Sequence, residues 1–258
     1  MMEKKPLILV TNDDGIRAPG IRALIEVMRS LGKVIVVAPD RPQSGASHSI
    51  TINVPLRLEK VVQLEDYEEY SCNGTPTDCV KLGIKAVMHC HPDLIVSGIN
   101  HGSNASVNII YSGTMAAVIE GCMAEIPSIG FSLLDYSMHA DFKPSLPCIR
   151  KITEQVLKNG LPFGVCLNVN IPNVSSKEIR GIRVCQQAGG TWQEDFDERT
   201  DPHGRDYYWL KGIFVKIGDG HHTDEYLLEN NYVSVVPVHT DMTAYEAIPQ
   251  LKYMDTDA

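Results

Sequence analysis

Two adjacent aspartates near the start of the chain are the first residues whose spacing suggests chemistry. The apolar run Leu7–Val10 leads into the polar segment Thr11–Gly15, which carries Asp13 and Asp14. Neighbouring carboxylates repel each other unless positive charge lies between them, so the pair favours a bound divalent cation. Both side chains reach one ion only if the backbone turns there, and Gly15 permits that turn. The structural alternative is an Asx turn that caps the next helix.

Two further polar loops, Pro39–Gly45 and Gly98–Asn104, follow the second and third predicted strands. Carboxylate, hydroxyl and amide oxygens favour a hard ion such as Mg²⁺ or Mn²⁺, whereas zinc calls for histidine or cysteine at suitable spacing. The sequence contains no HExxH motif and no paired-cysteine motif. Glycines in the second of these loops let a ligand lie near the backbone, where Asn100 and Asn104 can supply oxygens or amide donors.

The segment Tyr111–Thr114 directly precedes an apolar helix. Free backbone N–H groups and the positive end of the helix dipole make such a start a cradle for phosphate, formed by Ser112, Gly113 and Thr114. The structural alternative is an ordinary serine N-cap. The combination with the aspartate pair favours the phosphate site.

Two histidines lie near the same loops. His48 and His101 are candidates for a general acid, because imidazole titrates near neutral pH. A single loop histidine also occurs commonly as a bystander, so the general acid and base stay unassigned.

The elements that must position these residues alternate between strand and helix over the first 135 residues, which predicts a parallel sheet covered by helices. Ligands bind such sheets outside the carboxyl ends of the strands, where the polar loops meet. The periodicity predicts strands at 7–10, 34–38, 94–97, 128–133, 165–171 and 182–187, an extended segment at 50–58 with Pro55 at an edge or bulge, and helices at 18–31, 75–88, 112–125 and 146–158.

The character of the sequence changes after residue 187. Residues 189–218 are rich in charged and aromatic side chains, which predicts a long hairpin that is either an oligomer arm or a β-meander packed on its own subunit. A short helix at 223–230, a final strand at 232–238 and a frayed acidic end at 254–258 follow. We predict a single domain, with a core over about 1–187 and a hairpin and C-terminal arm over about 188–258.

Composition excludes several classes of protein. The 258 residues are 43% hydrophobic and 21% charged, as in soluble globular proteins. A net charge of −9 argues against binding a nucleic-acid polymer, which needs clustered lysine and arginine. The first apolar run is too short for a signal peptide or a membrane span, and seven scattered cysteines fit reduced core thiols. The expectation is a cytoplasmic protein with no membrane partner.

Several separate motifs in order resemble the SurE (survival protein E) family of nucleotidases. They are Ile8–Ile16, Val36–Asp40, Ser44 followed by His48–Thr51, Gly74–Val80, Asp93–Asn100 and Tyr111–Thr114, with a less sharp resemblance in the last hundred residues through Asn168–Pro172, Tyr207–Trp209 and Tyr232–Val235.

The resemblance implies that one divalent cation per subunit, Mg²⁺ or Mn²⁺, is held by Asp13, Asp14, Ser44 and Asn100. It also implies a Rossmann-like three-layer core and a swapped C-terminal arm that builds homodimers or homotetramers. The implied activity is hydrolysis of nucleoside 5′- and 3′-monophosphates, and in some members of polyphosphate.

The mechanism that we predict has metal-activated water attacking phosphorus, with Asp13 and Asn12 in catalytic roles and Asn12 and Asn104 orienting substrate or water. Ser112, Gly113 and Thr114 grip the remaining phosphoryl oxygens. Two alternatives stay open at this point. One is a phosphatase that forms an aspartyl-phosphate, although its DxD spacing is absent, and the other is a nucleotide sensor without catalysis.

Overall fold

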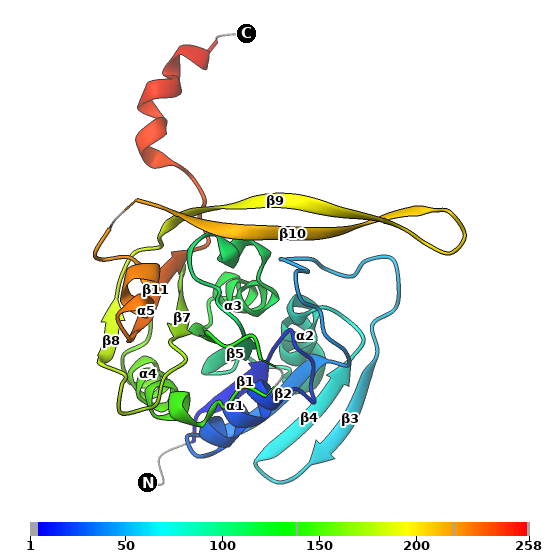
Figure 1. Cartoon of the computed structure of the whole chain (residues 1–258). Coiled ribbons are helices and arrows are strands. Elements are labelled where there is room, and N and C mark those ends of the chain that lie inside the picture. Colours follow the sequence, from blue (N-terminus) through cyan, green and yellow to red (C-terminus); the bar gives the residue numbers. More distant parts are fainter. Residues whose placement is uncertain (1–4, 138, 219, 257–258) are drawn as a thin grey trace.

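The computed structural model describes residues 5–137, 139–218 and 220–256. Its centre is a nine-stranded sheet in the order β3-β4-β2-β1-β5-β6-β7-β11-β8, and a two-stranded sheet, β9 with β10, stands apart from it (Figure 1). The six neighbours from β4 to β7 run parallel, while β3 and β11 are antiparallel to β4 and β7. The strands are β1 (Leu7–Thr11), β2 (Lys33–Pro39), β3 (Leu58–Gln63), β4 (Tyr67–Cys72), β5 (Leu94–His101), β6 (Ser128–Leu133), β7 (Val165–Ile171), β8 (Gly181–Val184), β9 (Gly189–Thr200), β10 (Asp206–Ile217) and β11 (Tyr232–His239).

Helices cover both faces of the large sheet, because successive residues of the buried strands point to opposite sides. Ile8 and Val10 of β1 pack in one cluster with apolar residues of α1 (Pro19–Arg29) and α4 (Leu146–Asn159). Leu9, between them, packs in a second cluster with residues of α2 (Pro76–Leu82) and α3 (Gly113–Met123). The fifth helix, α5 (Asp224–Glu229), packs against β11. The predicted three-layer, Rossmann-like fold class is confirmed.

The capping signals in the sequence correctly predicted where α2 begins. The Thr75 hydroxyl accepts from the backbone N–H of Asp78, whose carboxylate accepts from the N–H of Thr75, so the predicted capping box closes the start of α2. A π-helical stretch, Gly83–Met88, then completes the predicted helical span.

The predicted extended segment 50–58 is wrong in position. The chain has no regular strand from Ile50 to Arg57, and the edge strand β3 begins only at Leu58. The backbone N–H of Thr51 donates to the Asp78 carboxylate instead of to a neighbouring strand, which explains the irregular conformation. The sheet also contains β4, which the apolar pattern did not predict.

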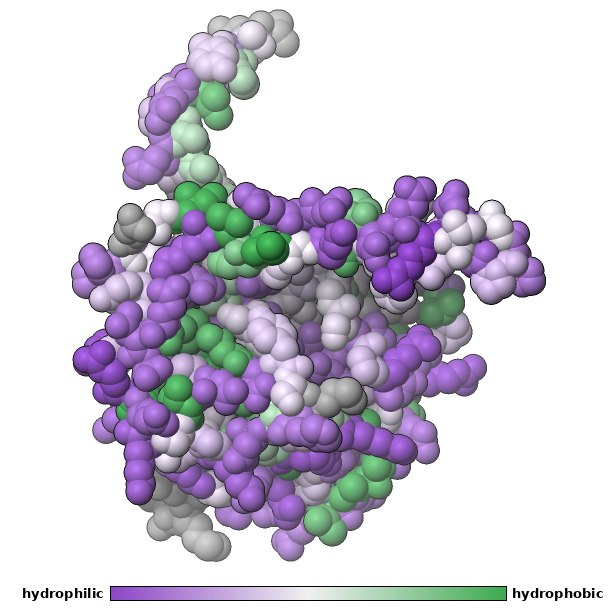
Figure 2. Space-filling model, in the orientation of Figure 1, coloured by the Kyte–Doolittle hydropathy of each residue, from purple (hydrophilic) through white to green (hydrophobic). Residues whose placement is uncertain are grey.

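The boundary at residue 187 needs a correction. The hairpin of β9 and β10 does leave the core there, but the chain returns to it, and β11 lies inside the large sheet between β7 and β8. The segment after His239 also projects from the body (Figure 2). Met242, Tyr245, Tyr253 and Met254 in this segment are exposed apolar side chains.

Two findings bear on the environment of the chain. All seven cysteines lie in the described residues and carry free thiols. Among the described residues, no helix combines the length and apolar character that crossing a bilayer requires.

Candidate active site

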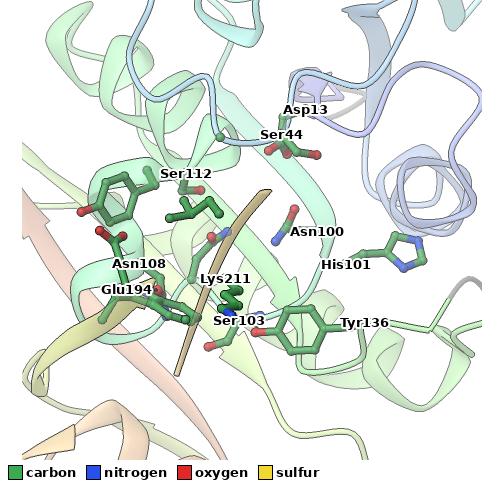
Figure 3. Close-up of a pocket in the computed structure, with 16 residues that line it drawn as sticks. Asp13, Ser44, Asn100, His101, Ser103, Asn108, Ser112, Tyr136, Glu194 and Lys211 are labelled. Carbon is green, nitrogen blue, oxygen red and sulfur yellow. Dashed lines mark hydrogen bonds between the residues drawn. The ribbon is translucent and has the colours of Figure 1, made fainter. Parts of the chain in front are cut away.

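A cavity of about 600 Å³ opens at the carboxyl ends of β1 and β5, beneath the hairpin (Figure 3). The polar loops predicted to converge do so here, and Asp13, Ser44, Asn100, Asn104 and Ser112 all line it. In Figure 3, Asp13 and Ser44 lie side by side near the top, whereas Glu194 and Lys211 come from the hairpin on the opposite side of the cavity.

Asp13 is the most buried carboxylate of the site, with only 4% of its surface exposed. The Thr114 hydroxyl donates to Asp13 Oδ1 at 2.5 Å, and the Asp13 carbonyl accepts from the N–H of Gln43 at 2.7 Å. Burial, and secondarily the charge of Asp14, raises the pKa of Asp13 to about 6. The fold therefore holds this carboxylate in an environment that penalises its negative charge.

Asp14 lies at the edge of the same site. Its Oδ2 accepts from the backbone N–H of His101 at 3.3 Å, which brings it beside Asn100. Burial raises the pKa of Asp14 as well. Asp14 is thus close to the cavity, although it is not one of the residues that form the cavity wall.

The donor set fits a hard divalent cation. In the described part of the chain, no lysine or arginine forms an ion pair with the buried Asp13 or the partly exposed Asp14, so the pair of carboxylates has no salt-bridge partner. No group of three or more His, Cys, Asp or Glu side chains in those residues is suited to hold a metal. The two carboxylates therefore need further oxygens, such as those of Ser44 and Asn100, to complete a site for Mg²⁺ or Mn²⁺.

Local structure holds those two further oxygen donors in place. Ser44 lies in a tight turn closed by the N–H of Ala46 donating to the carbonyl of Gln43 at 3.1 Å. The Asn100 side chain donates through Nδ2 to the Gly102 carbonyl at 3.0 Å, so its Oδ1 is the side-chain oxygen that can face a ligand. Both residues reach the cavity wall.

The start of α3 has the serine N-cap that the sequence offered, and the same serine faces the cavity. Ser112 Oγ accepts from the N–H of Met115 at 3.0 Å, so the serine is an N-cap, and it also lines the cavity. Gly113 lies against the aspartate, because a Cβ atom built on it would approach Asp13 Cβ to 2.8 Å. Gly113 and Thr114 do not line the cavity wall, and the hydroxyl of Thr114 is used by Asp13.

The side chains of three other candidates make contacts that direct them away from the cavity. Asn12 is fully buried and donates to the Gly15 carbonyl at 3.0 Å, so it braces the aspartate turn and does not reach the cavity. The ring of His48 faces Glu120, outside the cavity lining. His101 lines the cavity, but its ring packs edge-on against Phe142 and points away from Asp13 (Figure 3).

Asn104 connects the cavity to a buried polar network. Its Nδ2 donates to Ser132 Oγ at 2.8 Å, and its backbone N–H donates to Asn170 Oδ1 at 2.8 Å. Asn168 donates in turn to the Asn104 carbonyl at 2.8 Å. The loop after β5 is therefore fixed to β6 and β7, which pre-organises this part of the site.

The sequence analysis missed a second wall of the cavity. The hairpin contributes Trp192, Glu194, Leu210, Lys211 and Gly212, and the loops of the core add Asn108 and Tyr136. Trp192 Nε1 donates to Asn108 Oδ1 at 2.9 Å, which ties the hairpin to the core. The unusual run of charged and aromatic residues in the hairpin was the available signal, but it does not indicate which surface the hairpin covers.

Comparison with known proteins relates the chain to one family. The model of the family described as survival protein SurE matches residues 8–194. The chain is 61% identical over 253 residues to a 5′-nucleotidase SurE of Christiangramia forsetii, and 57% identical over 252 residues to one of Flavobacterium johnsoniae, with 97% of each chain covered in both cases. Among solved structures, the SurE protein of Aquifex aeolicus is 40% identical, with a TM-score of 0.85 over 97% of this chain and 100% of that one.

Proposed function

This chain belongs to the SurE family and is a 5′-nucleotidase, and from that premise we propose that it hydrolyses nucleoside monophosphates with the help of one divalent cation, Mg²⁺ or Mn²⁺, per subunit. The observation that carries the proposal is the position of Asp13. A buried, uncompensated carboxylate lies against the N-terminus of α3, where a cation and a phosphate monoester can share one cavity.

The residues on the core side of the cavity, opposite the hairpin, have separate parts in this proposal. Asp13, Asp14, Ser44 and Asn100 hold the cation. When bound, the cation supplies positive charge for the phosphoryl oxygens and makes water more acidic. Ser112, at the start of α3, binds the phosphoryl group, and Asn12 and Thr114 keep Asp13 in position.

The size and lining of the cavity support a nucleotide as the substrate. A cavity of about 600 Å³ holds more than a phosphate group, and pockets for small molecules have about this size. Beyond the phosphate end, the wall contains Trp192, Tyr136 and Leu210, which offer flat apolar surface to a base or ribose.

Removal of the metal tests the proposal directly. We expect release of phosphate from nucleoside 5′-monophosphates and from p-nitrophenyl phosphate to stop in EDTA and to return on addition of Mn²⁺ or Mg²⁺. Circular dichroism in EDTA checks that the fold survives. Activity that persists in EDTA would contradict the metal-dependent mechanism, and nucleotide binding without phosphate release would favour a sensor.

Replacement of Trp192 by alanine tests the second wall. Because the indole belongs to the hairpin wall and Asp13 to the core, we expect KM for nucleoside 5′-monophosphates to rise about tenfold while kcat/KM for p-nitrophenyl phosphate changes less than about twofold. Phe163→Ala, at an exposed aromatic outside the cavity, is the control. An equal loss for both substrates would show that Trp192 does not contact the leaving group.

Several finer properties extend the same proposal. We propose that 3′-monophosphates and short polyphosphates are further substrates, because the phosphate end recognises the phosphoryl group alone. The exposed apolar side chains after His239 support assembly as a homodimer or homotetramer, whose mass light scattering measures. The seven free cysteines support a cytoplasmic location.

A further inference from the structure

The loop that carries Ser44 is tied to α3 by residues outside the cavity. Immediately after the Ser44 turn, Ser47 adopts a positive φ of 52°, which is uncommon for a residue other than glycine. Its N–H donates to the Tyr111 carbonyl at 3.3 Å and its Oγ to the Ile110 carbonyl at 2.7 Å. The chain therefore leaves the Ser44 turn pressed against the segment that leads into α3.

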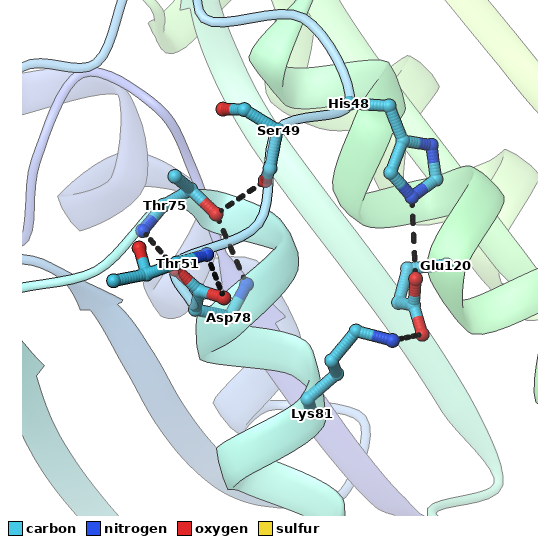
Figure 4. Close-up of polar contacts among 7 residues, drawn as sticks. All are labelled: His48, Ser49, Thr51, Thr75, Asp78, Lys81 and Glu120. Carbon is cyan, nitrogen blue, oxygen red and sulfur yellow. Dashed lines mark hydrogen bonds and ion pairs between the residues drawn. The ribbon is translucent and has the colours of Figure 1, made fainter. Parts of the chain in front are cut away.

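The next residue makes a side-chain contact with the helix itself. His48 Nε2 lies 3.2 Å from Glu120 Oε2, and the other carboxylate oxygen, Oε1, pairs with Lys81 of α2 (Figure 4). Only 12% of the Glu120 side chain is exposed. A carboxylate this buried is held in one orientation by its two partners, so it is a firm attachment point for the loop.

The position of Glu120 along α3 connects its contact with His48 to Asp13. Glu120 follows Gly113 by seven residues, so the two lie on nearly the same side of α3, about two turns apart. Gly113 packs against Asp13 at the other end of that side. One rigid helix thus sets the position of Asp13 at its first turn and of the Ser44 loop at its third.

The loop has other attachments that preserve the fold without His48. The N–H of Thr51 donates to Asp78 Oδ1 at 3.1 Å, and the Thr75 hydroxyl donates to the Ser49 carbonyl at 2.8 Å (Figure 4). The N–H of Gln43 binds the Asp13 carbonyl on the other side of Ser44. Loss of the His48 contact therefore leaves the loop bound at both ends and at Ser47, and removes the tie between the loop and the third turn of α3.

We propose that His48, through Glu120, is a positioning residue that holds Ser44 at the distance from Asp13 required for the divalent cation. This inference rests on the metal site of the proposed function. It assigns His48 a role different from a general acid, because its ring is directed at Glu120 and does not line the cavity.

The test is a double-mutant cycle read out as the Kd of Mn²⁺ in calorimetry, without substrate. We expect His48→Ala to weaken Mn²⁺ binding about tenfold, as residues behind metal ligands commonly do. Ser44→Ala removes the ligand itself and should weaken binding by at least as much. Because His48 acts through Ser44, adding His48→Ala to Ser44→Ala should change the Kd less than about twofold further.

Two variants separate positioning from a merely structural role. His48→Gln places an amide nitrogen where Nε2 lies and should restore Mn²⁺ affinity to within about threefold of the wild type. Lys81→Met removes the other partner of Glu120 but keeps the contact between Glu120 and the loop, so it should weaken Mn²⁺ binding by clearly less than His48→Ala does. Thermal unfolding of each variant reports any general loss of stability.

The outcomes distinguish this inference from the proposed function. If the wild type fails to bind Mn²⁺, the metal site itself is wrong. If Ser44→Ala weakens binding but His48→Ala does not, or if the two losses add in full, the metal site stands and the positioning role of His48 is overturned. A loss in Lys81→Met equal to that in His48→Ala would also overturn it.

Discussion

Replacement of Asp13 by asparagine is expected to lower kcat for a nucleoside 5′-monophosphate by at least about a thousandfold while the protein keeps its fold. The change removes one negative charge from the proposed metal site. It retains a side-chain oxygen that can accept the hydrogen bond from the Thr114 hydroxyl. Steady-state kinetics in saturating Mn²⁺ measure the loss. Asp66→Asn, a half-exposed carboxylate that pairs with Lys5, is the matched control and should keep wild-type activity. Turnover near the wild-type rate in Asp13→Asn would end the metal-catalysis mechanism.

The same variant is expected to be more stable than the wild type without metal at neutral pH. The raised pKa of Asp13 means that the folded state holds its proton up to about pH 6, whereas the unfolded chain releases it near 3.8. The fold therefore gains stability from this proton below about pH 4 and loses that gain as pH rises through 6. A rise in the pKa of Asp13 from 3.8 to about 6 corresponds to about 3 kcal/mol of stability, which the wild type loses as the pH rises. Asparagine does not titrate, so the variant does not lose this stability.

Chemical unfolding in EDTA between pH 4 and pH 8 measures this difference. The stability advantage of Asp13→Asn should grow as the pH rises and level off above about pH 7. Mn²⁺ should stabilise the wild type at pH 7.5 and have little effect on the variant, because the ion compensates the charge that the fold otherwise bears. A variant that is less stable at every pH would show that the Asp13 charge is already compensated within the protein.

Replacement of Gly113 by alanine is expected to lower kcat/KM about a hundredfold. The added Cβ would lie 2.8 Å from Asp13 Cβ and 3.0 Å from Asp13 Oδ2, so the aspartate must move. Displacements of about 1 Å in a catalytic group commonly cost this much activity. Alanine favours helix over glycine, and this gain offsets part of the strain in the stability of α3.

The control for this variant is Gly83→Ala in the helical stretch that follows α2. The atoms nearest to the added Cβ there are the terminal methyl groups of Leu9 at 3.0 Å and Val37 Cγ2 at 3.4 Å, and neither residue lines the cavity. Gly83→Ala should retain full activity. If Gly113→Ala also retains it, the packing of Asp13 against the start of α3 does not set the geometry of the reaction.

The residues that the sequence predicted correctly are those whose signals are local. Thr75 and Asp78 mark the start of α2 within four residues, and Ser112 marks the start of α3 in the same way. The polar loops after β1, β2 and β5 converge because parallel strands bring their carboxyl ends to one edge. The parallel topology of the sheet therefore explains why Asp13, Ser44 and Asn100 lie at the same edge.

The features that the sequence did not predict depend on partners that are distant in the chain. Strand β4 contains Glu69, a buried residue whose carboxylate pairs with Arg22 of α1 at 2.6 Å. A charged residue at a buried position interrupts the apolar pattern by which a strand is predicted. The His48 side chain offered no clue that it contacts Glu120, which follows it by 72 residues. The second wall of the cavity was missed for the same reason, because Trp192 reaches the site only once the hairpin has folded back over it.

The separation of the hairpin from the main sheet has a consequence for how such enzymes diverge. Strands β9 and β10 pair only with each other in the described residues, while the residues proposed to act on the phosphoryl group come from the core. We therefore expect substitutions in the hairpin to change which leaving group is accepted more than they change the groups proposed to act on the phosphoryl group.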